Sequence, residues 1–117
     1  MSSAEDKVDG WLTYSQVGEL MGESVNRVRR LVEDRTLVAL KRGKPKEYYV
    51  PELFMDGSAP LGSLRGTLIT LGDSGFSDEE AVVWLFTDDP SLPGRPIDAL
   101  RAGRKTEVRR RAQALAF

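Results

Sequence analysis

The chain contains neither cysteine nor histidine, and these two absences exclude most of the familiar catalytic and metal-binding sites. Without cysteine there is no disulfide framework and no thiolate metal site. Without histidine there is no Ser-His-Asp or Cys-His catalysis, no histidine zinc site and no ordinary general base near neutral pH. An enzyme would need carboxylates, lysine or tyrosine alone. The sequence therefore predicts a binding protein and not an enzyme, with no cofactor and no metal.

Long apolar runs are also missing. No stretch approaches the roughly 20 apolar residues of a membrane helix, and the acidic N-terminal residues 1–6 do not resemble a signal peptide. With 40% hydrophobic and 30% charged residues, the composition is that of a folded globular protein. We therefore expect a cytoplasmic protein without membrane contact. Its 117 residues suffice for one compact domain, or for two very small ones that share a core.

The net charge of −1 conceals four blocks of alternating sign. Residues 1–23 carry a net charge of −4, residues 24–46 carry +6, residues 47–94 carry −8 and residues 95–117 carry +5. Such asymmetry is typical of a face that binds a polyanion. The alternative is a solvated surface whose blocks pair with one another in the fold, and the charges alone favour neither interpretation.

Two short helices joined by a tight turn are predicted near the N-terminus. Thr13 is a suitable cap for a helix over residues 14–21, which Gly22 ends. Ser24 caps the next helix, over residues 24–34, which has three valines and a leucine along one side. Two short helices joined by a turn of about three residues that contains glycine are the signature of a helix-turn-helix.

The outward face of the second helix carries residue types that read DNA. Asn26 and Arg30 point directly away from the apolar side, and Arg27 and Arg29 flank them. Arginine fits the edge of guanine and asparagine the edge of adenine, each through two hydrogen bonds. A merely solvated face is the alternative, but the tight turn before this helix favours DNA. We expect Asn26, Arg27 and Arg30 to enter the major groove and Arg29 to hold a phosphate.

A β-hairpin is predicted over residues 38–50, because strand formers at residues 37–40 and 48–50 flank a turn rich in cations. It corresponds to the wing of winged-helix proteins, whose cations contact backbone phosphates without reading sequence. The predicted phosphate contacts are Lys41, Arg42, Lys44 and Lys46. Tyr48 and Tyr49 point to opposite sides of their strand. We expect one in the core, and the other to touch the nucleic acid or to cover the hairpin.

The C-terminal half is predicted to be a helical unit, so that the whole fold is mainly α with a small β-hairpin wing. We expect a disordered tail over residues 1–10, a winged helix-turn-helix DNA-binding domain over residues 11–56 and a helical domain over residues 61–117. Turn-forming residues at 56–60 predict a linker. Ser77 caps a helix that is apolar on most sides, which we expect at the centre of the C-terminal core.

Charged clusters in the C-terminal half have simple structural explanations. Three carboxylates at residues 78–80 lie in the first turn of a helix, where they complement the helix dipole. Asp88 and Asp89 precede Pro90 and are typical of a turn, although two carboxylates could also bind a cation. The cations of residues 101–111 form a second basic patch. This patch either extends the DNA footprint or pairs with the acidic block, and the sequence favours neither.

The segment from Leu12 to Leu53 resembles the MerR-like or excisionase-like winged-helix type. The resemblance rests on Val28-Arg29-Arg30-Leu31, on Leu37-Val38 and on a basic hairpin that ends in Tyr49-Val50-Pro51. This resemblance implies that the second helix is the recognition helix and that the hairpin is the wing.

The C-terminal half is more distinctive. Its segments Trp84 to Leu92, Arg95 to Leu100 and Val108 to Leu115 closely resemble an actinobacterial winged-helix DNA-binding family, which has a mycobacterial member known as a substrate of a membrane Ser/Thr protein kinase. The resemblance covers about residues 11–117 and implies a winged-helix N-terminal part, a helical C-terminal part and DNA binding. The mycobacterial type carries a longer N-terminal tail with a phosphorylatable threonine, whereas two serines are the hydroxyl residues before Trp11 here.

The same half also resembles the C-terminal domain of antitoxins of the Xre/ParS type, through Trp-Leu, Asp-Pro and Pro-Ile-Asp between Trp84 and Asp98. In those antitoxins this domain mediates contacts with a partner. An antitoxin-like or adaptor protein whose C-terminal helices bind a protein partner is therefore the alternative function. The function expected first is sequence-preferring binding to double-stranded DNA, as a transcriptional regulator. Its C-terminal helices would buttress the winged helix and bind a partner or a second copy.

Overall fold

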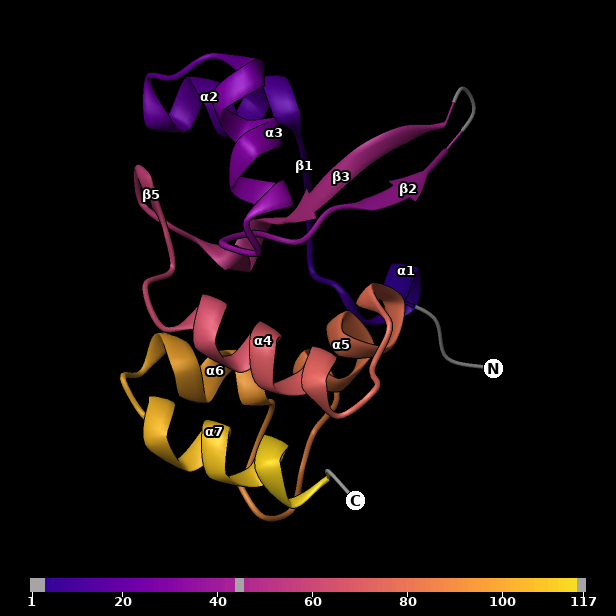
Figure 1. The fold of residues 1–117 in the computed structure, drawn as a ribbon, viewed down its shortest axis with the longest axis vertical. Helices are drawn as coiled ribbons and strands as arrows, with labels where there is room; N and C mark the ends of the chain where they lie inside the picture. Colours follow the sequence, from indigo (N-terminus) through magenta and orange to yellow (C-terminus); the bar gives the residue numbers. More distant parts are fainter. Residues whose placement is uncertain (1–3, 44–45, 116–117) are drawn as a thin grey trace. The chain divides into compact units, whose positions relative to one another are not determined.

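The structure is a computed structural model, and it describes residues 4–43 and 46–115 (Figure 1). The chain forms two compact units. Asp9–Leu61 is the winged-helix unit, and the described residues of Met1–Val8 and Gly62–Phe117 are the helical unit. Helices dominate and the sheets are small and antiparallel, so the predicted fold class, mainly α with a small hairpin wing, is confirmed. Among the described residues, no helix combines the length and the apolar character needed to cross a membrane.

The helix-turn-helix is built by capping interactions between near neighbours. It consists of α2 (Tyr14–Met21) and α3 (Val25–Glu33). The Thr13 hydroxyl accepts a hydrogen bond from the Gln16 N–H at 3.1 Å, and the Gln16 side chain accepts one from the Thr13 N–H at 2.8 Å. Gly22 ends α2 at φ 67°, a left-handed conformation that glycine adopts without strain. Both predicted helices are confirmed. Their sequence signals could be recognised because capping interactions join residues that are close in the chain.

A three-stranded antiparallel sheet completes the wing. In spatial order it contains β1 (Trp11–Thr13), β3 (Glu47–Pro51) and β2 (Leu40–Arg42). Thr13 pairs with Tyr49 across the first ladder. The sequence did not predict β1, because three residues carry too little pattern to indicate a strand. Its presence makes β3 the central strand, with a neighbour on each side.

The first strand of the hairpin starts later than predicted. Leu37, Val38 and Ala39 are buried but lie outside any strand, so their apolar character reflects core packing. Lys41 and Arg42, which the sequence placed in the turn, belong instead to β2. In a strand, neighbouring side chains point to opposite faces, so these two cations cannot both face the same ligand.

Residues 56–60, predicted to be a linker, belong mostly to a second small hairpin. After the 3₁₀ helix η1 (Glu52–Phe54), β4 (Met55–Asp56) pairs with β5 (Ala59–Pro60). The turn between them contains Gly57 at φ 64°. The residues that favour a linker are also those that favour a tight turn, and only the pairing of the flanking residues distinguishes the two.

In the helical unit, the inward sides of the helices form an aliphatic core. The described helices are α1 (Ala4–Lys7), α4 (Leu64–Asp73), α5 (Asp78–Leu85), α6 (Pro96–Arg101) and α7 (Lys105–Ala114). Helix α4 lies beside α7 (Figure 1). Ala81, Val82 and Leu85 of α5 are buried, as predicted, and so are the leucines of α4 that follow its inward side.

The prediction of a disordered tail over residues 1–10 is wrong for Ala4 to Val8. Ala4 is fully buried and Val8 is 8% exposed. The Ala4 N–H donates a hydrogen bond of 3.1 Å to Oε2 of Glu79 in α5, which is 75 positions away in the chain. The acidic composition of this segment concealed two apolar residues one helical turn apart, which face the helical unit.

Candidate nucleic-acid interface

The outward face of α3 carries the four residues that the sequence selected for DNA contact. Asn26, Arg27, Arg29 and Arg30 are all exposed, whereas the opposite side of the helix is held by the buried Val28 and its neighbours. The Arg29 Nη1 donates a hydrogen bond of 3.0 Å to Oδ1 of Asn26. Within the described part of the chain, the side chains of Arg27 and Arg30 have no hydrogen bond or ion pair. Their guanidinium groups are therefore available to a ligand.

The turn that precedes α3 packs tightly on α2, and a glycine makes this possible. The Glu23 N–H donates a hydrogen bond of 2.9 Å to the carbonyl oxygen of Gly18. A Cβ atom at Gly18 would lie 2.7 Å from the Glu23 carbonyl oxygen, closer than real side chains approach. Gly18 belongs to none of the motifs recognised in the sequence above. A glycine inside a short helix, four residues before the glycine that ends it, is the signal that could have found it.

The predicted wing cations do not share one face. Lys41 is exposed, and its Nζ lies 5.8 Å from the centre of the Tyr48 ring. Arg42 is half-buried, and its Cζ lies 5.8 Å from the centre of the Trp11 ring. Lys46 is exposed next to the turn, and Lys44 lies outside the described residues. The structure therefore places Lys41 and Arg42 on opposite faces of the sheet, with Arg42 against an aromatic ring of its own sheet.

Two tyrosines stack on one face of the wing. The rings of Tyr14 and Tyr48 lie 6.0 Å apart with an angle of 13° between their planes. Tyr48 is 49% exposed. On the other face of β3, Tyr49 is half-buried, and its hydroxyl donates a hydrogen bond of 3.3 Å to Oε2 of Glu47. The expectation that either Tyr48 or Tyr49 lies in the core is wrong. Each lies on a different face of the sheet, and neither is buried.

The surroundings of Tyr14 connect this face of the wing with α3. Burial raises the pKa of the Tyr14 hydroxyl, and the neighbouring Tyr48 raises it further, while Arg29 opposes the shift and Glu33 adds to it. Arg29 and Glu33 both belong to α3. Tyr14 is therefore neutral at physiological pH, and it lies within electrostatic range of Arg29 and Glu33 on α3.

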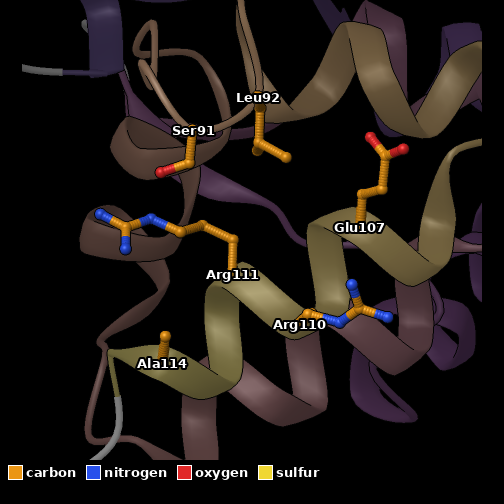
Figure 2. A pocket seen from close by; sticks show the side chains of 6 residues that line it. All are labelled: Ser91, Leu92, Glu107, Arg110, Arg111 and Ala114. Atoms are coloured by element: carbon orange, nitrogen blue, oxygen red, sulfur yellow. The ribbon is translucent and has the colours of Figure 1, made fainter.

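In the helical unit, the second basic patch pairs in part with carboxylates. A shallow groove has a volume of about 260 Å³. Figure 2 shows the side chains that line it, which are Ser91, Leu92, Glu107, Arg110, Arg111 and Ala114. Arg111 Nε donates to Oδ2 of the buried Asp89 at 2.9 Å, and Arg104 pairs with Glu107 at 3.1 Å. Of the two alternatives left open for this patch, pairing with the acidic block is confirmed for Arg111. Asp89 thus has a structural role.

Asp89 makes the stability of the helical unit depend on pH. Burial raises the pKa of Asp89, but the hydrogen bonds from Arg111 and Ser91 lower it by more, so it lies below its ordinary value. The stabilisation is therefore present above the unfolded pKa of about 3.9 and is lost as pH falls through the folded pKa. We expect Asp89→Asn to lower the free energy of unfolding by about 1–2 kcal/mol at pH 7. Chemical denaturation should show this difference shrinking below about pH 4.

Asp98→Asn is the matched control for Asp89→Asn. Asp98 also accepts from an arginine, Arg95, at 2.8 Å, but its side chain is 54% exposed. Exposed ion pairs contribute little to stability, so this variant should lose clearly less stability at pH 7 than Asp89→Asn. The assigned role would be contradicted if Asp89→Asn had the same free energy of unfolding as the parent at pH 7. It would also be contradicted if the loss in free energy of unfolding were the same at all pH values. Among the residues described, no group of three or more acidic side chains could hold a metal ion.

Comparison with known proteins covers both units of the chain. Residues 4–55 match the family model described as "DNA-binding protein Rv2175c, wHTH domain". Residues 61–116 match "Rv2175c C-terminal domain of unknown function". The chain is 38% identical over 115 residues to the DNA-binding protein Rv2175c of Mycobacterium tuberculosis (strain ATCC 25618 / H37Rv), which spans 87% of this chain and 77% of that protein. The NMR structure of Rv2175c superposes with a TM-score of 0.82 at 36% identity, covering 92% of this chain and 82% of that one.

Proposed function

Because the chain belongs to the family of the DNA-binding protein Rv2175c, we propose that it binds double-stranded DNA through its winged-helix unit. We further propose that it prefers particular base sequences and acts as a transcriptional regulator. The observation that carries the proposal is the outward face of α3, where one asparagine and three arginines stand exposed directly after a tight turn. A recognition helix needs this combination of residue types and exposure.

The dimensions of α3 suit the major groove. The helix contains nine residues, from Val25 to Glu33, and an α-helix with its side chains is about 10–12 Å in diameter. The major groove of B-DNA is about 12 Å wide and admits one α-helix. Asn26 and Arg27 lie in the first turn of α3, the end that contacts base edges in helix-turn-helix proteins. Arg30 follows one turn later on the same side.

The hydrogen bond between Arg29 and Asn26 is compatible with reading of adenine. A bidentate contact to adenine requires the Asn26 side chain to accept a hydrogen bond through Oδ1 and to donate one through Nδ2. Oδ1 has two lone pairs, so it can accept from Arg29 and from the base together. Arg29 would then orient the Asn26 amide while its other N–H groups face a phosphate. We therefore propose that Arg29 contacts a phosphate and also orients the Asn26 side chain.

The wing would supply phosphate contacts beside the groove. Lys41 and Lys46 are exposed on the described part of the hairpin, and Lys44 belongs to the same proposal by its position in the sequence. Contacts of this kind position a protein on the duplex without selecting a base sequence. Because Arg42 stacks on Trp11, we place it outside the set of direct contacts.

The test of DNA binding is a titration of double-stranded DNA at several salt concentrations. If about six phosphates are neutralised, the logarithm of the association constant should fall with the logarithm of salt with a slope near −5. Lys46→Ala should weaken binding to all sequences about equally and reduce the slope by about one unit. Lys7→Ala, the same change in α1 and outside both basic blocks, is the control and should leave the slope as in the parent. No association of the parent at low salt would contradict the proposal.

Sequence preference is tested by selecting bound fragments from a random DNA pool. Enrichment of a motif would support a regulator that recognises particular sites. A palindromic motif would also report that two copies bind together, since the symmetry of half-sites mirrors the symmetry of the protein. If the parent protein binds DNA but the pool stays random after selection, the protein binds DNA without sequence preference.

A further inference from the structure

Three side chains form a row across the sheet of the wing. Leu12 pairs with Val50 and Thr13 with Tyr49, so continuation of this register places Tyr14 beside Tyr48. On the other side of β3, Lys41 is the partner of Tyr48. The row thus runs Tyr14, Tyr48, Lys41, with the stacked rings 6.0 Å apart and Lys41 Nζ at 5.8 Å from the second ring.

Tyr14 and Lys41 flank the Tyr48 ring on its two sides in this row. β3 is the central strand, so Tyr14 approaches the ring from the side of β1 and Lys41 from the side of β2. A nucleic-acid base would have to displace one of them in order to stack on the ring. Tyr48 is nevertheless 49% exposed. What it can offer to a ligand is therefore its edge and its hydroxyl group, and not a stacking surface.

The Tyr48 hydroxyl is placed differently from that of its neighbour. The Tyr49 hydroxyl donates to Glu47, whereas the Tyr48 hydroxyl makes no hydrogen bond with any residue in the described ranges. The nearest charge on the row is the ammonium group of Lys41. A neutral O–H donor beside a cation, both on an exposed surface, suits an anion with several acceptor oxygens. A phosphate of the DNA backbone is such an anion.

We propose that the Tyr48 hydroxyl and the Lys41 ammonium group together bind one phosphate of the DNA backbone, and that the stacked Tyr14 ring holds Tyr48 in place. This proposal rests on the proposed DNA binding and adds Tyr48 to the interface. The site lies on the part of the wing next to the helix-turn-helix, because Tyr14 is the first residue of α2, which packs against α3. It would anchor the strand that borders the groove occupied by α3.

Tyr48→Phe tests the hydroxyl alone, because it keeps the stacked ring and the contact with Lys41. A hydrogen bond to a charged group is lost, so we expect about tenfold weaker binding to all DNA sequences. The salt slope should not change, because tyrosine carries no charge. Lys41→Gln should also weaken binding and reduce the slope by about 0.9 units. If both groups hold one phosphate, the fold loss in DNA affinity of the double variant should be smaller than the product of the two single fold losses.

Tyr49→Phe is the matched control, because it removes a hydroxyl from the next residue of the same strand on the opposite face. It should bind DNA like the parent. If the parent binds and Tyr48→Phe binds equally well, or if Tyr49→Phe is weakened to the same extent, the phosphate site is wrong while DNA binding through α3 stands. If the fold loss in affinity of the double variant equals the product of the two single losses, the two groups do not share a phosphate. A parent that binds no DNA overturns the proposed function and this site together.

Discussion

Arg30→Ala is expected to weaken binding to a selected DNA site by about 1–3 kcal/mol and to relax the preference for one base pair. Arg30 is exposed on α3, directly opposite the side that packs on the core. Its guanidinium group has no partner among the described residues, so binding does not first have to break a contact within the protein. A bidentate contact to guanine O6 and N7 would be lost, which explains both effects.

The measurement is a titration of the selected site and of single-base variants of that site, for both the parent and Arg30→Ala. In the variant, all four bases at one position should become nearly equivalent, while discrimination at the other positions stays. Arg65→Ala in α4 removes an exposed arginine of the helical unit that lies outside the second basic patch, and it serves as the control. If Arg30→Ala and Arg65→Ala show the same affinities and the same base preferences, α3 is not the recognition helix.

Gly18→Val is expected to destabilise the winged-helix unit by about 3 kcal/mol and to abolish specific DNA binding. A Cβ atom at this position already meets the Glu23 carbonyl oxygen at 2.7 Å. This oxygen belongs to backbone, and the Glu23 N–H is hydrogen-bonded to Gly18 itself, so the turn cannot move away without breaking that bond. Valine adds two methyl groups and a poorer helix propensity. The turn would open, and α3 would lose its position relative to α2.

Gly62→Val is the matched control for the glycine substitution. A Cβ atom at Gly62 meets nothing within 4 Å, so the change in stability should stay within about 0.5 kcal/mol. The chain has two tryptophans, Trp11 in the winged-helix unit and Trp84 in the helical unit. In a Trp84→Phe background, the fluorescence of Trp11 during chemical denaturation reports on the winged-helix unit by itself. Equal midpoints for the two glycine variants would show that the turn is not tightly packed.

Interactions between near neighbours were readable from the sequence. The caps of α2 and α3, the stop at Gly22 and the apolar sides of both helices depend on residues within about one turn of one another. These local signals suffice to predict a helix-turn-helix with an arginine-rich outward face. The same holds for α5, where Ser77 caps the helix as predicted and forms a capping box with Glu80. A helix is stabilised along its own chain, so its sequence carries most of the information.

Contacts between distant residues were decided by the tertiary structure alone. Ala4 and Glu79 are 75 positions apart, and Asp89 and Arg111 are 22 positions apart. No local pattern links such residues, because their proximity depends on how whole helices pack. The missed strand β1 belongs to the same class. Three residues indicate no strand until their partner in β3 is known, since a β-ladder is stabilised by its neighbour and not along its own chain.

The composition of the wing predicts a basic hairpin, but the face on which each side chain lies depends on the tertiary structure. Sequence alone shows that cations and two adjacent tyrosines surround a turn, and it predicts a basic hairpin. Which cation reaches which face depends on the strand register, and a shift of one residue exchanges the two faces. The register places Lys41 with Tyr48 on one face and directs Arg42 towards Trp11. Charge and propensity are properties of single residues, whereas a binding site is a property of the side chains that the fold brings together.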